Sequence, residues 1–328
     1  MRIRLPLSIL LLLTLLVSGS GLTAVSATSA NMAVAAVGAA PPKTSLLQQH
    51  VERWIGQLSK NDAFHAWRGA GYETSPLGPG THSWLVLVKQ KKVTVGYLVV
   101  QALDDGGLSL GEYGLGSHPL YDAIVLRGAI ERLELERAPL SAVREYVHPL
   151  LAVWKVKTDS DSFEYADAAS GEWLPLGEEL WKETRLAEAN VLGDGLRSLT
   201  AALTTMRTNE PFDVYDRMPW LTASPLSLSM DAEGSGRSAG RGAGGGAGGE
   251  AGGQAEVSFT LPALLDSDEQ IRYAAERYEG TALFVWSVIG YHGWNEGTVY
   301  AALQSSGEED HVRYIPLTLL ARLGSFYR

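Results

Sequence analysis

The side chains that most often carry out chemistry in proteins are few in this sequence. The 328 residues contain no cysteine and seven histidines. The lack of a thiol excludes disulfides, thiolate metal ligands and cysteine nucleophiles. No two histidines have the His-x-His or His-x-x-x-His spacing of a zinc site; they are His50, His65, His82, His118, His148, His292 and His311. The sequence therefore predicts neither a metal site nor a cofactor.

Acidic side chains outnumber basic ones. The chain has 37 aspartate and glutamate residues against 27 lysine and arginine residues, for a formal net charge of -10. Because phosphate binding needs a basic face, we predict that nucleic acid is not a partner. Asp213, Asp216 and Asp231 lie close together in the sequence. We interpret them as solvated surface acids, not as a catalytic carboxylate pair.

The N-terminal segment has the layout of a secretory signal. Arg2 and Arg4 are followed by an apolar run over residues 5–17 and then by small residues, with a cleavage site predicted after Ala27. This run is shorter than the roughly 20 residues that span a bilayer. We expect a signal peptide over residues 1–27, and a secreted or cell-envelope protein that contacts a membrane only if the signal stays uncleaved. Small residues and two prolines indicate a flexible leader over 28–43.

The segment 44–176 is expected to form a small α+β domain. Apolar residues at helical spacing predict a helix from Thr44 or Ser45 to Leu58. Three β-branched, apolar runs then predict an antiparallel meander. The expected strands lie at 83–88, 93–100, 108–113, 150–157, 162–166 and 172–176, with a helix at 123–137.

A helical connector (177–210) and a second domain (211–328) are expected to follow. Residues 234–254 are made almost wholly of small and polar residues, and we interpret them as a disordered Gly-rich insertion, since the Lys-Ser/Thr pair of a phosphate-binding loop is missing. The remaining pattern predicts helices at 268–278 and 317–323 and strands at 282–289, 298–304 and 311–316.

Short motifs in the second domain resemble a known family. Residues 283–291 (Leu-Phe-Val-Trp-Ser-Val-Ile-Gly-Tyr), 299–304 (Val-Tyr-Ala-Ala-Leu-Gln) and 314–317 (Tyr-Ile-Pro-Leu) resemble the C-terminal half of papain-like cysteine peptidases of the bacteriocin-processing type, family C-39. Residues 222–230 (Thr-Ala-Ser-Pro-Leu-Ser-Leu-Ser-Met) resemble the nucleophile segment of that family. The resemblance implies a papain-like α+β fold for residues 211–328.

The same resemblance implies that the catalytic residues are lost. Aligned on these motifs, the nucleophile falls on Ala223, the histidine on Phe284 and the aspartate on Leu303. A thiolate, an imidazole and an orienting group are all needed for this chemistry, and none of the three side chains supplies one. The resemblance therefore implies a peptidase-like protein that is not an enzyme.

The first domain resembles a prosequence. Residues 84–88, 96–100, 112–114 and 165–172 are similar to strands of the prosequence domains that precede some exported papain-like peptidases. The expected architecture is therefore a small, prosequence-like antiparallel sheet domain followed by a degenerate papain-like domain.

Three functions follow from these patterns. The first is an exported, non-catalytic protein whose vestigial cleft binds a peptide or a protein partner, such as an exported peptidase or an envelope component. Its candidate binding residues are Trp220, Ser224, His292 and Trp294, with Trp294 expected to be an exposed contact in a Gly-flanked loop. The second is an active hydrolase in which Ser224 is the nucleophile and His292 the base. The third is a structural envelope interaction module.

Overall fold

The structure is a computed structural model, which describes most of the chain from residue 45 to residue 328. The described residues are 45–78, 83–132, 139–192, 196, 202–216, 219–229, 259–294, 297–306 and 311–328. The predicted signal peptide (1–27), the leader (28–43) and the Gly-rich insertion (234–254) lie outside them. Within the described residues, no helix is long and apolar enough to span a bilayer.

The first helix begins where the sequence predicts. Helix α1 (Leu46–Leu58) is capped by Ser45, whose hydroxyl accepts a hydrogen bond from the Gln48 amide at 3.2 Å. Such a cap satisfies one of the free amides at a helix start. The helix buries Val51, Trp54 and Leu58, so the helical spacing of these apolar residues marks its packed face.

Four antiparallel strands follow. Strands β2 (Ser83–Gln90), β3 (Val93–Ala102) and β4 (Leu108–Leu115) form the predicted meander. Strand β1 (Gly71–Pro76) was not predicted and pairs with β2 at the edge of the sheet. Its sequence carries no apolar alternation, so pairing with β2 is what makes it a strand.

A second, three-stranded sheet consists of β5 (Ser141–His148), β6 (Leu151–Lys157) and β7 (Phe163–Asp167). Helix α2 (Ala123–Arg132) confirms the described part of the predicted helix. The strand predicted at 172–176 is wrong, because only an isolated bridge from Trp173 to Ala166 forms there. The chain turns at Leu174, whose carbonyl accepts from the Leu176 amide, and then enters helix α3 (Glu178–Glu188).

Several elements predicted in the C-terminal segment are present in the structure. Strands β10 (Ala282–Trp294), β11 (Thr298–Gln304) and β12 (Val312–Pro316) and helix α5 (Leu317–Leu323) lie where they were expected. The shorter elements are η1 (Asp62–Trp67), η2 (Pro219–Thr222), α4 (Leu261–Asp266) and β13 (Ser325–Tyr327).

Two helical predictions are wrong. The segment predicted as a helix at 268–278 contains strand β9 (Ile271–Arg277), which pairs with β10 along its whole length. In the described part of the connector 177–210, α3 is the only helix, and the connector ends in strand β8 (Leu203–Thr208), which pairs with β10. In both places the strand partner overrides local sequences that favour a helix.

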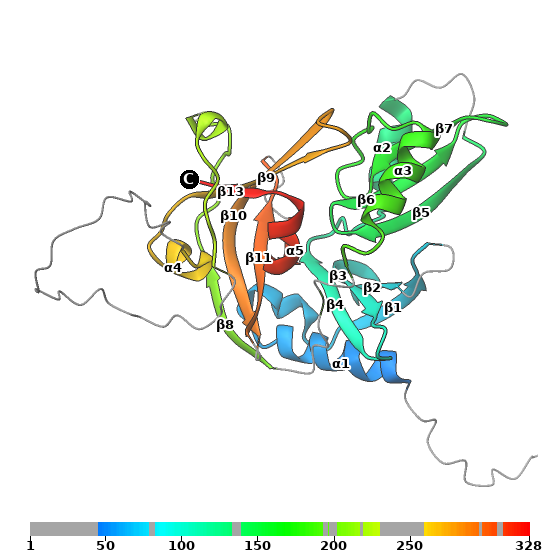
Figure 1. The fold of residues 1–328 in the computed structure, drawn as a ribbon. Helices are drawn as coiled ribbons and strands as arrows, with labels where there is room; N and C mark the ends of the chain where they lie inside the picture. Colours follow the sequence, from blue (N-terminus) through cyan, green and yellow to red (C-terminus); the bar gives the residue numbers. More distant parts are fainter. Residues whose placement is uncertain are drawn as a thin grey trace, which may run out of the picture. The chain divides into compact units, whose positions relative to one another are not determined.

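One large sheet joins the N-terminal and C-terminal segments. Its order is β1-β2-β3-β4-β12-β11-β10-β9-β13, with β8 also paired to β10, and all of its pairs are antiparallel (Figure 1). Strands β4 and β12 meet with Tyr113 opposite Tyr314 and Gly114 opposite Arg313. The boundaries predicted at residues 176 and 211 therefore do not separate two sheets. The predicted α+β class is confirmed.

Candidate binding site

A cavity lies between the β7 turn and the edge of β10. Its volume is about 280 Å³. The turn that follows β7 forms one wall, and the opposite wall and the floor come from β10, β11 and β12. The residues that matter below are Asp167, Glu172, Phe284, Trp286, Leu303 and Arg313.

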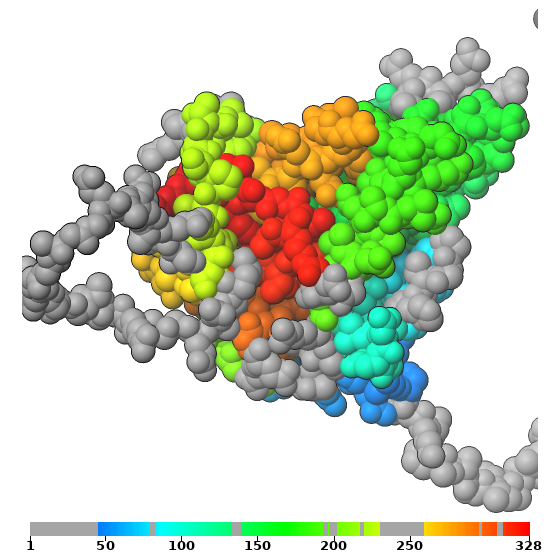
Figure 2. Space-filling model, in the orientation of Figure 1, coloured from blue at the N-terminus to red at the C-terminus, as the bar shows by residue number. Residues whose placement is uncertain are grey.

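Two stacked aromatic rings form the apolar side of the cavity. Phe284 and Trp286 are two positions apart on β10, so their side chains share one face of the strand. Their ring centroids are 5.7 Å apart and the planes differ by 8°. Tyr278 at the end of the β9–β10 hairpin contacts the edge of the Phe284 ring and packs with the core of the small sheet, against which the hairpin lies (Figure 2). Tyr278 therefore supports the Phe284 ring, on which Trp286 stacks.

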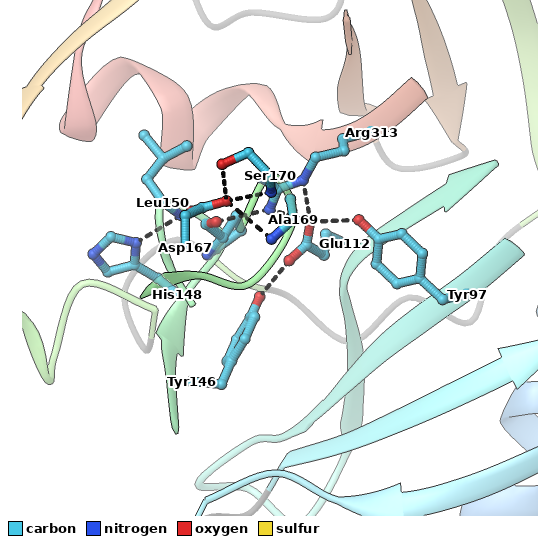
Figure 3. Close-up of polar contacts among 10 residues, drawn as sticks. Tyr97, Glu112, Tyr146, His148, Leu150, Asp167, Ala169, Ser170 and Arg313 are labelled. Carbon is cyan, nitrogen blue, oxygen red and sulfur yellow. Dashed lines mark hydrogen bonds and ion pairs between the residues drawn. The ribbon is translucent and has the colours of Figure 1, made fainter. Parts of the chain in front are cut away.

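A fixed guanidinium forms part of the floor. Arg313 donates from Nε (3.1 Å) and Nη2 (2.7 Å) to Glu112 Oε2, and Nη2 also donates to the Pro149 carbonyl at 2.7 Å (Figure 3). Glu112 is fully buried. Such charge-assisted bonds hold a planar guanidinium in one orientation. Arg313 therefore presents a positioned polar group to the cavity.

The carboxylate of Glu112 is shared among several donors. Tyr97 donates to Oε2 and Tyr146 to Oε1, each at 3.1 Å (Figure 3). Burial raises the pKa of Glu112, whereas Arg313 and the two tyrosines act to lower it. Glu112 does not line the cavity. Its chemistry is thus that of a buried acceptor that positions Arg313, not that of an acid or base exposed to a ligand.

Asp167 builds the wall opposite the aromatic rings. Its Oδ1 accepts from the amides of Ala169 (2.9 Å) and Ser170 (2.8 Å) and from the Ser170 hydroxyl (3.1 Å) (Figure 3). This pattern is an Asx turn, which fixes the loop after β7. Glu172 continues the same wall and is exposed. The wall therefore carries two carboxylates.

The three positions aligned with catalytic residues are not all together. Phe284 and Leu303 both line the cavity. Ala223 lies outside the lining, directly after the short helix η2, where its amide donates to the Trp220 carbonyl at 3.1 Å. The described residues 224–229 contain no helix, so Ala223 does not lie at a helix N-terminus.

His292, a candidate binding residue and base, belongs to the core. It is 1% exposed on β10, its Nδ1 bonds the Tyr113 hydroxyl at 2.7 Å, and its ring centroid lies 4.1 Å from that of Tyr314. Burial lowers the pKa of His292 to about 3. Ser224 is exposed. The geometry of the described residues therefore does not assemble the serine–histidine pair of the hydrolase hypothesis.

The prediction of an exposed contact at Trp294 is wrong. Trp294 is 2% exposed because β10 continues beyond its predicted end, where the residue pairs with Leu203 of β8 and Thr298 of β11. Its Nε1 lies 3.4 Å from the Tyr113 hydroxyl. Trp220 is also buried and donates from Nε1 to the Val214 carbonyl at 3.0 Å.

Trp220 nevertheless lines a second cavity. This cavity has a volume of about 510 Å³ and lies on the β9 side of the hairpin, with Leu283 and Tyr327 also in its lining. Among the described residues, no group of three or more histidine, aspartate or glutamate side chains is placed to hold a metal ion.

Sequence reasoning missed Glu112 and Arg313. Each is a single charged residue inside an otherwise apolar strand, and a charge in such a position is normally paired. That signal predicts a buried ion pair in general. It does not identify the partner, because the two residues are separated by 201 positions in the sequence.

Comparisons with family models, with curated proteins and with solved structures found no match. The resemblance to papain-like peptidases therefore stays a prediction made from the sequence.

Proposed function

We propose that this chain is an exported, non-catalytic, papain-like protein that binds a peptide or an exposed segment of a partner protein in the cavity between the β7 turn and β10. The observation that carries this proposal is that Phe284 and Leu303, aligned with a catalytic histidine and aspartate, line one cavity. In this interpretation the chain retains the cleft of the papain-like family that its sequence resembles, but apolar side chains replace the catalytic ones.

The lining favours binding over catalysis. Phe284 and Leu303 cannot transfer protons, and the charge of Arg313 is compensated by Glu112. His311, Ser305 and Ser306 also line the cavity, and the Ser306 hydroxyl donates to the Asp213 carboxylate at 3.0 Å. A nucleophile needs a neighbouring base to become reactive, and the cleavage assay below tests whether these groups supply one.

The same lining suits a peptide. It combines stacked aromatic rings, an oriented guanidinium, two carboxylates and serine hydroxyls, which complement apolar side chains and backbone amides. A volume of about 280 Å³ lies just below the roughly 300–1,000 Å³ of small-molecule sites. We infer that the cavity holds a short part of a longer ligand, and that the rest of the ligand lies outside it.

We propose that the encounter takes place outside the cytoplasm, in accordance with the predicted signal peptide. A secreted peptidase or a cell-envelope component is accordingly the kind of partner we propose, and the prosequence-like first domain supports the former.

Filling the cavity tests the proposal. Residues 28–328 are used to select binders from a random peptide library, and the affinity of the selected peptides is then measured for Ser306→Trp. Ser306 is exposed at the cavity rim, so a larger side chain there leaves the core unchanged. We expect binding to weaken about tenfold or more. The matched control is Ser160→Trp, in the exposed turn between β6 and β7, which should bind as the unmodified protein does.

Two outcomes contradict the proposal. One is a library from which no peptide binds, or whose binders are insensitive to Ser306→Trp. The other is cleavage of labelled casein or of the selected peptides by the purified protein, which would show that the chain is an active peptidase.

A further inference from the structure

The cavity runs along the edge of strand β10. Four consecutive residues of this strand line it: Leu283, Phe284, Val285 and Trp286. Successive side chains of a strand point to opposite faces of the sheet. A space that touches all four therefore lies beside the strand, in the direction in which its backbone amides and carbonyls form hydrogen bonds.

Among the described residues, this part of β10 has a strand neighbour on one side only. Strand β9 pairs with it from Ala282 to Val288. On the other side, β11 pairs only as far as Ser287, opposite Gln304. If β11 continued in register, Ser305 and Ser306 would lie opposite Trp286 and Val285. Instead both serines lie outside the strand and line the cavity, so the described residues leave the edge from 282 to 286 without a strand partner.

The edge is also unprotected by its sequence. Residues 282–286 read Ala-Leu-Phe-Val-Trp, with no charge and no proline. Monomeric proteins normally protect sheet edges with charged residues, proline or bulges, because a bare edge pairs with other chains. The outer strand β1 of the same sheet follows that rule, since it carries Glu73 and ends at Pro76. The β10 edge differs in having none of these features.

The groups facing the edge indicate which ligand would fit. Across the cavity lie the carboxylates of Asp167 and Glu172, while the positive charge of Arg313 is balanced by Glu112. The formal charge of the whole chain is -10. A ligand with a basic side chain near this wall is therefore favoured over an acidic one.

We propose that the ligand is an extended segment of a partner protein that adds as a strand to residues 282–286 of β10 and directs a lysine or arginine toward Asp167 and Glu172. The inference rests on the proposed function, since it specifies how the same cavity holds a peptide. Backbone hydrogen bonds to the edge supply affinity, and alternate side chains of the segment supply specificity. One apolar side chain packs on the rings of Phe284 and Trp286.

The binding mode is tested with three synthetic probes. The parent is a fluorescein-labelled peptide, acetyl-Thr-Val-Lys-Val-Thr-Val-amide, and its binding to residues 28–328 is followed by fluorescence anisotropy. In the second probe glutamate replaces the lysine. In the third the amides on one edge of the peptide are N-methylated, which removes donors without removing side chains. We expect the second and third probes to bind about tenfold more weakly than the parent.

Two protein variants test the two walls. Leu283→Lys places a charge on the bare edge at a half-exposed position, and we expect it to weaken binding of the parent peptide about tenfold. Its matched control is Leu186→Lys on α3, where the side chain is 72% exposed. Glu172→Lys leaves one negative charge, Asp167, and one positive charge on the wall, so it should abolish the preference between the lysine and glutamate probes. Glu179→Lys, at a side chain that is 84% exposed on α3, should leave the preference unchanged.

The outcomes separate this inference from the proposed function. One outcome is that library peptides bind and Ser306→Trp weakens their binding, whereas N-methylation of the probe and Leu283→Lys leave the affinity of the probe unchanged. The cavity then binds peptides, and strand addition is overturned. Failure of the parent probe, with library binders lacking basic residues, overturns the stated ligand chemistry. If no peptide binds at all, the proposed function fails first.

Discussion

The junction of β4 and β12 separates two buried environments that share the same two strands. Neighbouring residues of a strand face opposite sides, so Glu112 and Arg313 lie on one face and Tyr113 and Tyr314 on the other. On the first face, two opposite charges and two tyrosine hydroxyls form a bonded network (Figure 3). On the second face, Tyr113, Tyr314 and His292 stack, and the buried Nε2 of His292 has no hydrogen-bond partner among the described residues.

The difference shows two ways of burying an ionisable group. Glu112 is paired with Arg313 and accepts from hydroxyls, so its charge is compensated where it lies. His292 has no acidic partner in the described part of the chain, and burial keeps it neutral by lowering its pKa to about 3. The first face should therefore be sensitive to the loss of a partner, and the second to pH.

Breaking the ion pair is expected to have the largest effect. In Arg313→Met, Glu112 loses its counter-charge while it stays buried, and removal of one partner from such a pair costs about 3–5 kcal/mol. The measurement is the free energy of unfolding in urea at neutral pH. The matched control is the double variant Glu112→Leu with Arg313→Met, which removes both charges and should recover much of the loss. Equal stabilities of the single and double variants would contradict a compensated pair.

Acidification is expected to act on the other face. The unfolded chain protonates His292 near its ordinary pKa of 6.5, but the folded chain does so only near pH 3. The unfolded state thus binds the additional proton in this window, and the free energy of unfolding decreases as the pH falls, by up to about 1.4 kcal/mol per pH unit.

His292→Phe should remove this dependence. Relative to the unmodified protein, the variant should gain on the order of 2–3 kcal/mol between about pH 7 and pH 4.5. Urea unfolding at both pH values measures the gain. Burial also lowers the pKa of His148, but that residue is present in both proteins and its contribution cancels. Parallel pH profiles of the two proteins would show that His292 is not the titrating group.

A smaller effect is expected from Gly114, which shares a face of β4 with Glu112. A Cβ at this position would collide with the Tyr97 ring and lie 2.9 Å from the Val312 carbonyl oxygen. Gly114→Ala should therefore displace Tyr97 from Glu112 and cost about 1–3 kcal/mol in unfolding free energy. Gly56→Ala in α1, where nothing lies within 4 Å of the added carbon, should be neutral or stabilising. Equal effects of both changes would show that the contact with Tyr97 is not tight.

Local pattern was sufficient for much of the fold. The meander β2–β4, the strands β10 and β11 and the helix α5 have strong apolar periodicity, and the structure has them where they were predicted. Strand β9 was mistaken for a helix because its Ala-Ala-Glu-Arg sequence favours a helix, and only β10 makes it a strand. Strand β1 has no apolar pattern, so only its pairing with β2 in the folded chain makes it a strand.

The site was less accessible from the sequence. Phe284 and Leu303 were identified through a family resemblance, and the structure brings both to one cavity. Their neighbours Asp167 and Arg313 come from strands far apart in the chain, so no local pattern relates them. Trp294 was predicted to be exposed because glycines flank it, and His292 to lie in the cleft, but the local sequence does not reveal that β8 pairs with this part of β10.

The pairing of β4 with β12 also has a consequence for how the chain folds. Glu112 and Arg313 are 201 residues apart, so a very large loop closes before the centre of the sheet exists. Until β12 is available, a nascent chain carries β4 as an open edge with Tyr113 uncovered. Exposed strand edges favour aggregation, so we expect the chain to be most prone to aggregate before β12 has paired with β4.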